Sequence, residues 1–128
     1  MTIPGEQTDL AYLAGIFDGE GYISPRRATQ RGVVRMTYYL GIANTSTDLM
    51  EWLGRIGGNV YSCRLRTERQ VYEWRICRQI DVLMFLRAIQ PYLRIKRDKA
   101  NRTIAHLEAR IASRSECPEL ELLVARRD

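Results

Sequence analysis

The chain has 128 residues, of which 45% are hydrophobic and 27% are charged, and its formal net charge is +5. This composition suits one globular domain with its own core, and the lack of any run of about 18 apolar residues argues against a membrane span. Three distant cysteines without a CxxC pair, together with a single histidine, argue against a disulfide framework or a structural zinc site. We therefore expect one intracellular domain over residues 1–128, with its core at about 7–112 and a tail or short helix at 113–128.

The charge is distributed unevenly along the chain. Residues 1–21 contain four acids and no base, whereas residues 22–78 contain ten arginines against four acids. An arginine-rich middle segment is typical of a surface that contacts nucleic acid. The plainer alternative is a solvated surface that happens to be rich in arginine.

The first predicted element is a helix that Thr8 or Asp9 would cap and that ends near Asp18. Its apolar residues recur at helical spacing and predict a buried stripe: Leu10, Leu13, Ala14 and Phe17. A second strip holds small residues four apart: Ala11, Gly15 and Gly19. Because such a strip has almost no side chains, another backbone can come very close to it.

The end of this helix combines acidic residues with glycines. Gly19 and Gly21 suit the left-handed backbone that closes many helices. Glu20 puts a carboxylate at the negative end of the helix dipole, which disfavours it by roughly 0.3–1 kcal/mol, and Asp18 adds a second negative charge. A divalent cation is the natural compensation, whereas the plainer interpretation of Glu20 is a surface carboxylate.

After Gly21 the hydrophobic period changes from helical to two, which predicts a hairpin with strands at about 22–27 and 33–43. The remaining predicted elements, in chain order, are a helix that is capped within 44–47 and ends at Gly57-Gly58, strands over 60–66 and 71–77, a helix that ends at about Gln90, and a helix over 98–112. The order α-β-β-α-β-β-α-α predicts an α+β fold, with a four-stranded antiparallel sheet and helices on one face. The other face would be polar and rich in arginine.

Residues 13–21, Leu-Ala-Gly-Ile-Phe-Asp-Gly-Glu-Gly, resemble the signature motif of the LAGLIDADG homing endonucleases position by position. Two further segments are similar to family landmarks: Asn44-Thr45, before a helix that ends in Gly-Gly, and the segment 91–96, Pro-Tyr-Leu-Arg-Ile-Lys. The family shares the order α-β-β-α-β-β-α, so the resemblance covers about residues 7–105 and implies the family fold with a DNA-binding sheet. A single motif without an internal repeat resembles the homodimeric group.

The resemblance implies a double-strand break by phosphodiester hydrolysis at a long, roughly palindromic DNA target, as in intron homing. Mg²⁺ would be the cofactor, and Ca²⁺ would bind without supporting cleavage. By resemblance, Glu20 is the metal ligand and the backbone carbonyl of Gly19 joins it. Asn44 would hold metal-bound solvent, and Lys96 would support charge near the scissile phosphate. Asp48 stands where relatives can carry a second basic residue, which puts the solvent network in doubt.

Each of these residues also has a structural interpretation. Asn44 can be a helix cap, Lys96 a solvated lysine, and Asp18 a residue that caps or steers the helix end. We expect the large aromatic residues Trp52, Trp74 and Phe85 to lie in the core. The single histidine, His106, is expected on a helix surface.

One catalytic carboxylate per chain is too few for a site that holds two metal ions, so we expect a two-fold dimer that brings two copies of Glu20 together. The residues predicted at the dimer interface lie on the first helix: Ala11, Ala14, Gly15 and Asp18. The predicted partners are therefore double-stranded DNA and a second copy of the chain, with no membrane.

The polar strand faces are expected to contact base edges in the major groove, since residues two apart can follow successive bases. The expected contacts are Ser24, Arg26, Arg35, Thr37, Tyr39, Arg64, Arg66, Glu73 and Arg75. Glu73 either accepts from cytosine or holds Arg75 or Arg64 in place. Residues near the turns, namely Arg27, Arg31 and Arg69, more plausibly contact phosphate.

Two rival functions share this fold. The first is a DNA-binding regulator that has lost cleavage. The second is an intron splicing factor that binds RNA through a basic surface on the later helices: Arg94, Lys96, Arg97, Lys99, Arg102 and Arg110. A preference for duplex DNA over structured RNA would separate the two.

Overall fold

The computed structural model describes residues 1–64 and 69–114. Its elements, in chain order, are α1 (Gln7–Glu20), β1 (Gly21–Gln30), β2 (Val33–Asn44), α2 (Thr47–Ile56), β3 (Asn59–Arg64), β4 (Gln70–Ile76), α3 (Gln79–Ile89), the 3₁₀ turn η1 (Gln90–Tyr92) and α4 (Arg97–Arg114). The predicted order and the α+β fold class are confirmed.

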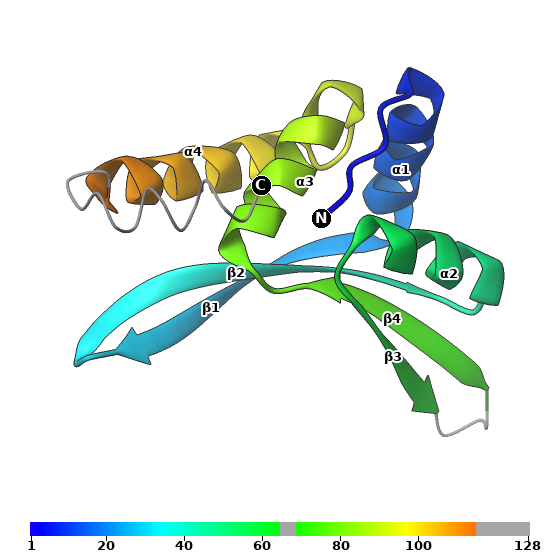
Figure 1. Ribbon diagram of the computed structural model, residues 1–128, viewed down its shortest axis with the longest axis horizontal. Helices are drawn as coiled ribbons and strands as arrows, with labels where there is room; N and C mark the ends of the chain where they lie inside the picture. The colour runs from blue at the N-terminus through cyan, green and yellow to red at the C-terminus, as the bar shows by residue number, and fades with distance from the viewer. Residues whose placement is uncertain (65–68, 115–128) are drawn as a thin grey trace.

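The four strands form one antiparallel sheet in the order β1-β2-β4-β3, so the two hairpins lie side by side. All four helices cover one face of this sheet, and the opposite face is open (Figure 1). The far ends of both hairpins bend away from the helices, which makes the open face concave. The molecule thus presents a curved sheet surface that its helices leave bare.

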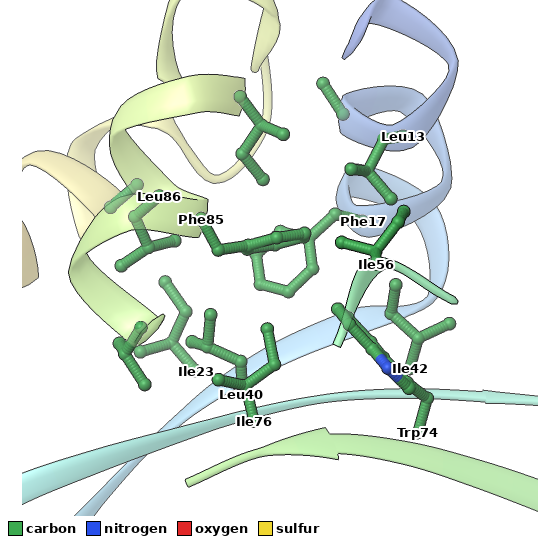
Figure 2. Packing of buried hydrophobic residues seen from close by; sticks show 14 of the residues in the cluster. Leu13, Phe17, Ile23, Leu40, Ile42, Ile56, Trp74, Ile76, Phe85 and Leu86 are labelled. Carbon is green, nitrogen blue, oxygen red and sulfur yellow. The ribbon is translucent and has the colours of Figure 1, made fainter. Parts of the chain in front are cut away.

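The core lies between the sheet and the helices and is centred on three aromatic rings (Figure 2). The rings of Phe17 and Trp74 each contact Phe85 edge to face, with centroids 5.5 and 5.4 Å apart. Leu40 and Ile42 of β2 are fully buried beneath them, as the alternation of that strand predicts. The predicted core positions of Trp74 and Phe85 are therefore confirmed.

The two ends of α1 differ from the prediction. The helix begins at Gln7, and Glu6 at its N-cap makes no side-chain cap. At the other end the helix continues through Gly19 to Glu20, and Gly21 has an extended backbone (φ −83°, ψ 165°), so the predicted left-handed closure is wrong. Gly21 is needed for space instead, because a Cβ there would fall within the Phe17 ring.

The start of α2 follows the expected pattern. Ser46 is its N-cap, and the Ser46 hydroxyl accepts a hydrogen bond from the backbone N–H of Leu49 at 3.2 Å. The helix ends at Gly57, whose φ of 149° favours glycine.

Side chains bond to backbone groups of β2 on the side where this strand lacks a partner. β4 pairs with β2 only over 40–44, so the preceding part of β2 has no strand on that side. The amide of Gln79 takes the place of a strand: it accepts from the backbone N–H of Tyr38 at 2.9 Å and donates to the Tyr38 carbonyl at 2.7 Å. Arg110 Nη1 donates to the Met36 carbonyl at 2.7 Å.

His106 belongs to the same region. It is half-buried, and its Nδ1 lies 2.6 Å from the hydroxyl of Tyr38. The prediction that His106 is only a helix-surface residue is therefore wrong, because α4 packs this face against β2 rather than against solvent.

Candidate functional site

Glu20 lies where α1 meets the sheet, and its carboxylate is exposed. The side-chain amide of Asn44, the last residue of β2, donates to Glu20 Oε2 at 2.6 Å. Asn44 Oδ1 in turn accepts from the backbone N–H of Ser46 at 2.8 Å. Because that bond fixes the orientation of the amide, the NH₂ group of Asn44 must point toward Glu20. The fold thus brings Glu20 and Asn44 together, with Asn44 also serving the turn before α2.

A groove of about 570 Å³ opens beside this pair. It lies between α1 and the start of α2, and its lining consists of Tyr12, Gly15, Ile16, Gly19, Glu20, Asn44, Ser46 and Leu49. Glu20 Oε1 has no hydrogen-bond partner within residues 1–64 and 69–114. One oxygen of the carboxylate is therefore held, and the other remains available to a ligand.

The small-residue strip of α1 lies along this groove. Ala11, Gly15 and Gly19 are exposed, and a Cβ built at either glycine would meet nothing within 4 Å. Ala14, however, is fully buried in the core of its own chain, so its predicted place at a dimer interface is wrong. The turn of the helix puts Ala14 on the stripe that faces the core with Leu13, one position away from the small strip.

Asp18 is engaged inside its own chain. Its carboxylate accepts from the backbone N–H groups of Arg94 (2.7 Å), Ile95 (3.2 Å) and Lys96 (3.0 Å). Burial by itself would raise the pKa of Asp18, but these three bonds and the charge of Lys96 outweigh it and lower the pKa. The geometry agrees with the structural interpretation, in which Asp18 ties the segment before α4 to the end of α1.

Asp18→Asn is expected to lower the free energy of unfolding at pH 7 by about 2 kcal/mol, because hydrogen bonds to a charged acceptor contribute about 1.5–3 kcal/mol. The folded pKa lies below the unfolded value, so the contribution is present above about pH 4 and is lost as the pH falls through the folded pKa. Urea denaturation at pH 7 and pH 3 measures both effects. Asp98→Asn, at an exposed position in the first turn of α4, is the control and should cost at most about 1 kcal/mol.

Lys96 lies near the same end of α1 but contacts neither Glu20 nor Asn44. Its Nζ donates to the backbone carbonyl of Asp18 at 2.6 Å, which places a positive charge at the negative end of the helix dipole. Lys96 as a whole is half-buried there. Its predicted part in catalysis stays a prediction.

Most of the predicted DNA contacts share the open face of the sheet. The register places seven of them there: Ser24, Arg26, Arg35, Thr37, Tyr39, Glu73 and Arg75. Arg26 and Arg35 are exposed, and the hydroxyl of Thr37 donates to the carbonyl of Arg26 at 3.0 Å. Three arginines therefore line one concave surface.

At position 64 the structure gives the strand pairing alone, with Gln70 opposite. The predicted base contact of Arg64 therefore stays a prediction. The preceding residues of β3, namely Val60, Tyr61 and Ser62, are all exposed. The predicted contact Arg66 lies outside the described residues.

Around Arg75 the open face carries a tight cluster. Arg75 Nε and Nη2 donate to the two carboxylate oxygens of Glu73 at 3.0 and 3.2 Å, and the Tyr22 hydroxyl donates to Glu73 Oε1. The hydrogen bonds from Arg75 lower the pKa of Glu73 against the effect of burial. Burial, with the adjacent carboxylate, raises the pKa of Tyr22 to about 12. Glu73 therefore holds Arg75, which is one of its two predicted roles.

Two tyrosines of this cluster were missed by sequence reasoning. Tyr22 shares a face with Ser24 and Arg26, and the alternation of β1 could have shown this. Tyr61 pairs with Glu73 on the open face, which only the pairing of β3 with β4 reveals.

Two general findings bear on the site. Within the part of the chain that the structure describes, no helix is long and apolar enough to cross a membrane. In the same residues, no three His, Cys, Asp or Glu side chains come together as a group that could hold a metal ion. Glu20 therefore belongs to no such group within residues 1–64 and 69–114.

Residues 7–90, well over half of the chain, match the profile of a family described as LAGLIDADG-like domain. No curated protein matches the sequence.

Solved structures of homing endonucleases share the fold. The homing endonuclease I-CvuI in complex with its target in the presence of Ca superposes with a TM-score of 0.62 and 21% identity, over 93% of this chain and 76% of that one. The archaeal intron-encoded homing endonuclease I-Vdi141I, complexed with DNA, superposes with a TM-score of 0.59 and 17% identity, over 82% of this chain and 70% of that one. The LAGLIDADG meganuclease I-AabMI, bound to uncleaved DNA, superposes with a TM-score of 0.65 and 16% identity, over 98% of this chain but only 46% of that one.

Proposed function

The chain belongs to the LAGLIDADG family, and we propose that it is a homodimeric, metal-dependent and site-specific DNA endonuclease. Each subunit reads one half of a long, roughly palindromic duplex, and the two subunits together make a double-strand break by phosphodiester hydrolysis. Such a break would serve the homing of an intron. The observation that carries the proposal is Glu20, an exposed carboxylate that Asn44 holds at the end of a helix lined with small residues.

The residues at the groove fit a divalent cation. Mg²⁺ prefers carboxylate and carbonyl oxygens, and Glu20 Oε1 faces no competing group in the described chain. The carbonyl of Gly19 is one of the last four of α1, which have no partner inside a helix. Glu20 and Gly19 would therefore hold the ion, and structures of I-CvuI obtained with Mg and with Ca support a divalent metal. When bound, the ion would supply an activated water and neutralise charge on the phosphate.

The small strip of α1 supports the dimer. A glycine inside a helix costs about 0.8–1.0 kcal/mol relative to alanine, and nothing in the described part of this chain requires Gly15 or Gly19, since a Cβ would have room at both. A second copy of α1 packed against the strip would explain both glycines, because its backbone would occupy the space that side chains at positions 15 and 19 would otherwise fill. Tyr12, which borders the groove and is 59% exposed, would be covered by the same contact. The two-fold axis then brings both copies of Glu20 to one region.

The protein side of the reaction follows from these positions. Asn44 fixes the carboxylate of Glu20 and can hold solvent beside it. Lys96, close to the same helix end, would contact the scissile phosphate and offset its developing charge. The arginines of the concave face would hold the duplex by its phosphates and base edges.

The test is a selection on a randomised palindromic DNA library with the native chain, in parallel with Mg²⁺ and with Ca²⁺. Enriched products that are cut at a fixed position only with Mg²⁺ would support the nuclease and reveal its target. Sequence-selective binding without cleavage in either metal would overturn the enzyme and leave a DNA-binding regulator. Selective binding of structured RNA over duplex DNA would overturn both in favour of a splicing factor.

Asn44→Ala is expected to lower the cleavage rate by about 10–100-fold, which is typical for a residue that orients a metal ligand. The affinity for DNA in Ca²⁺ should change little, because Asn44 lies outside the concave contact surface. Single-turnover cleavage and a binding titration measure the two quantities. Thr45→Ala, at the adjacent exposed position, is the control, and an equal loss of rate in both variants would contradict the role of Asn44.

A further inference from the structure

The guanidinium of Arg75 is fixed by its neighbours. Glu73 takes the Nε–Nη2 edge with two hydrogen bonds. The rings of Tyr39 and Tyr61 lie 5.5 and 5.6 Å from the guanidinium carbon, and Tyr39 packs edge to face on Tyr22. A long side chain that is normally mobile is therefore held in one orientation before any partner arrives.

The two charged groups differ in what they can reach. The side chain of Glu73 is 18% exposed, whereas that of Arg75 is 41% exposed. The carboxylate oxygens of Glu73 accept hydrogen bonds from Arg75 and from the Tyr22 hydroxyl. A guanidinium whose Nε–Nη2 edge is taken still has its Nη1–Nη2 edge, and two parallel N–H groups match O6 and N7 of guanine.

Tyr22 of β1 is the third member of this cluster. Its ring lies over Gly41, where a Cβ would overlap the ring, and its hydroxyl donates to Glu73. Gly41 pairs with both Tyr22 and Arg75 in the sheet, so a gap in β2 lets the phenol reach across to β4.

We propose that Glu73 is a positioning residue that fixes Arg75 to read one guanine in each half-site, and that Tyr22 secures Glu73. The inference rests on the proposed DNA-binding function. It chooses between the two roles open to Glu73, because three of the four lone-pair sites of its carboxylate accept within the cluster and the side chain is only 18% exposed. It also assigns a part to Tyr22, which reads no base.

The expected position of this guanine follows if β2 runs along the groove of the bound duplex. Arg75 lies opposite Gly41, three residues along β2 from Asn44. A strand rises about 3.3 Å per residue and B-DNA about 3.4 Å per base pair, so in that alignment the guanine would lie about three base pairs from the Glu20 end of each half-site.

The experiment measures binding in Ca²⁺ to the selected palindrome and to its variants with each base at every half-site position. The native chain should prefer guanine at one inner position by about tenfold or more. Arg75→Ala should abolish that preference. Glu73→Gln and Tyr22→Phe should reduce it severalfold at that position alone, with the preferences elsewhere unchanged. Glu108→Gln is the matched control, because Glu108 pairs with Arg87 on the helices, away from the sheet.

The outcomes separate the inference from the proposed function. A uniform loss of affinity at all positions in Glu73→Gln would mean a merely structural role and overturn the inference, and thermal melting of each variant shows whether it folds. Loss of a cytosine preference in Glu73→Gln would overturn it as well, because Glu73 would then read a base itself. If the native chain binds no DNA sequence selectively, the proposed function and the inference both fail.

Discussion

Glu20→Gln is expected to abolish cleavage in Mg²⁺ and to leave DNA binding in Ca²⁺ largely intact. Glutamine keeps the size of the side chain and can still pair with Asn44, but it lacks the charge that a metal ion requires. A catalytic metal is worth several kcal/mol and each 1.4 kcal/mol is tenfold in rate, so the loss should be about a thousandfold or more. Under the proposed function, affinity would come mainly from phosphate and base contacts on the sheet, so it should change by less than about tenfold.

Glu51→Gln is the matched control, since Glu51 is an exposed glutamate on α2 outside the groove lining. Its cleavage rate should equal that of the native chain. Single-turnover rates and binding titrations on the same duplex compare the three proteins. Residual cleavage by Glu20→Gln within tenfold of the native rate would remove Glu20 from the metal site.

Gly15→Leu should separate the two subunits without harming the fold of either. A Cβ at Gly15 meets nothing within 4 Å in the single chain, the position is exposed, and leucine raises helix propensity. In the proposed two-fold interface the substitution occurs twice, and overpacking costs about 1–3 kcal/mol at each site, so the dissociation constant of the dimer should rise by about thirtyfold or more. Sedimentation velocity over a range of concentrations measures this, and cleavage should fall in parallel.

The control for this variant is Gly54→Leu, at an exposed glycine within α2 where a Cβ would make only an ordinary contact with Val60. It should leave association and cleavage unchanged. A Gly15→Leu protein that remains dimeric and active would show that the small strip of α1 is not the interface.

The fold could be predicted from sequence because its signals are local. The change of hydrophobic period at Gly21 separates α1 from β1, and Ser46 and Gly57 mark the ends of α2. The role of Gly21 could not be found in this way. Nothing in the local sequence shows that the ring of Phe17, one helical turn earlier, occupies the space beside its backbone.

The residues that share a face of the sheet could be predicted where the alternation of side chains within one strand decides the face. The shared face of Ser24 and Arg26 follows from β1 alone, but the place of Tyr61 beside Glu73 depends on the pairing of β3 with β4. The bonds of Asp18 join residues 76 to 78 positions apart, and no pattern in the sequence points to them. Pairing across strands and contacts between distant segments are therefore what the structure adds.

The side-chain closure of the β2 edge has a consequence for aggregation. A long strand with unpaired backbone groups is a template on which a strand of another molecule can add. Gln79 satisfies both backbone groups of Tyr38, and Arg110 satisfies the carbonyl of Met36. Addition of a strand from another molecule at these backbone groups is thereby blocked, although they lie on the side of β2 that β4 leaves unpaired.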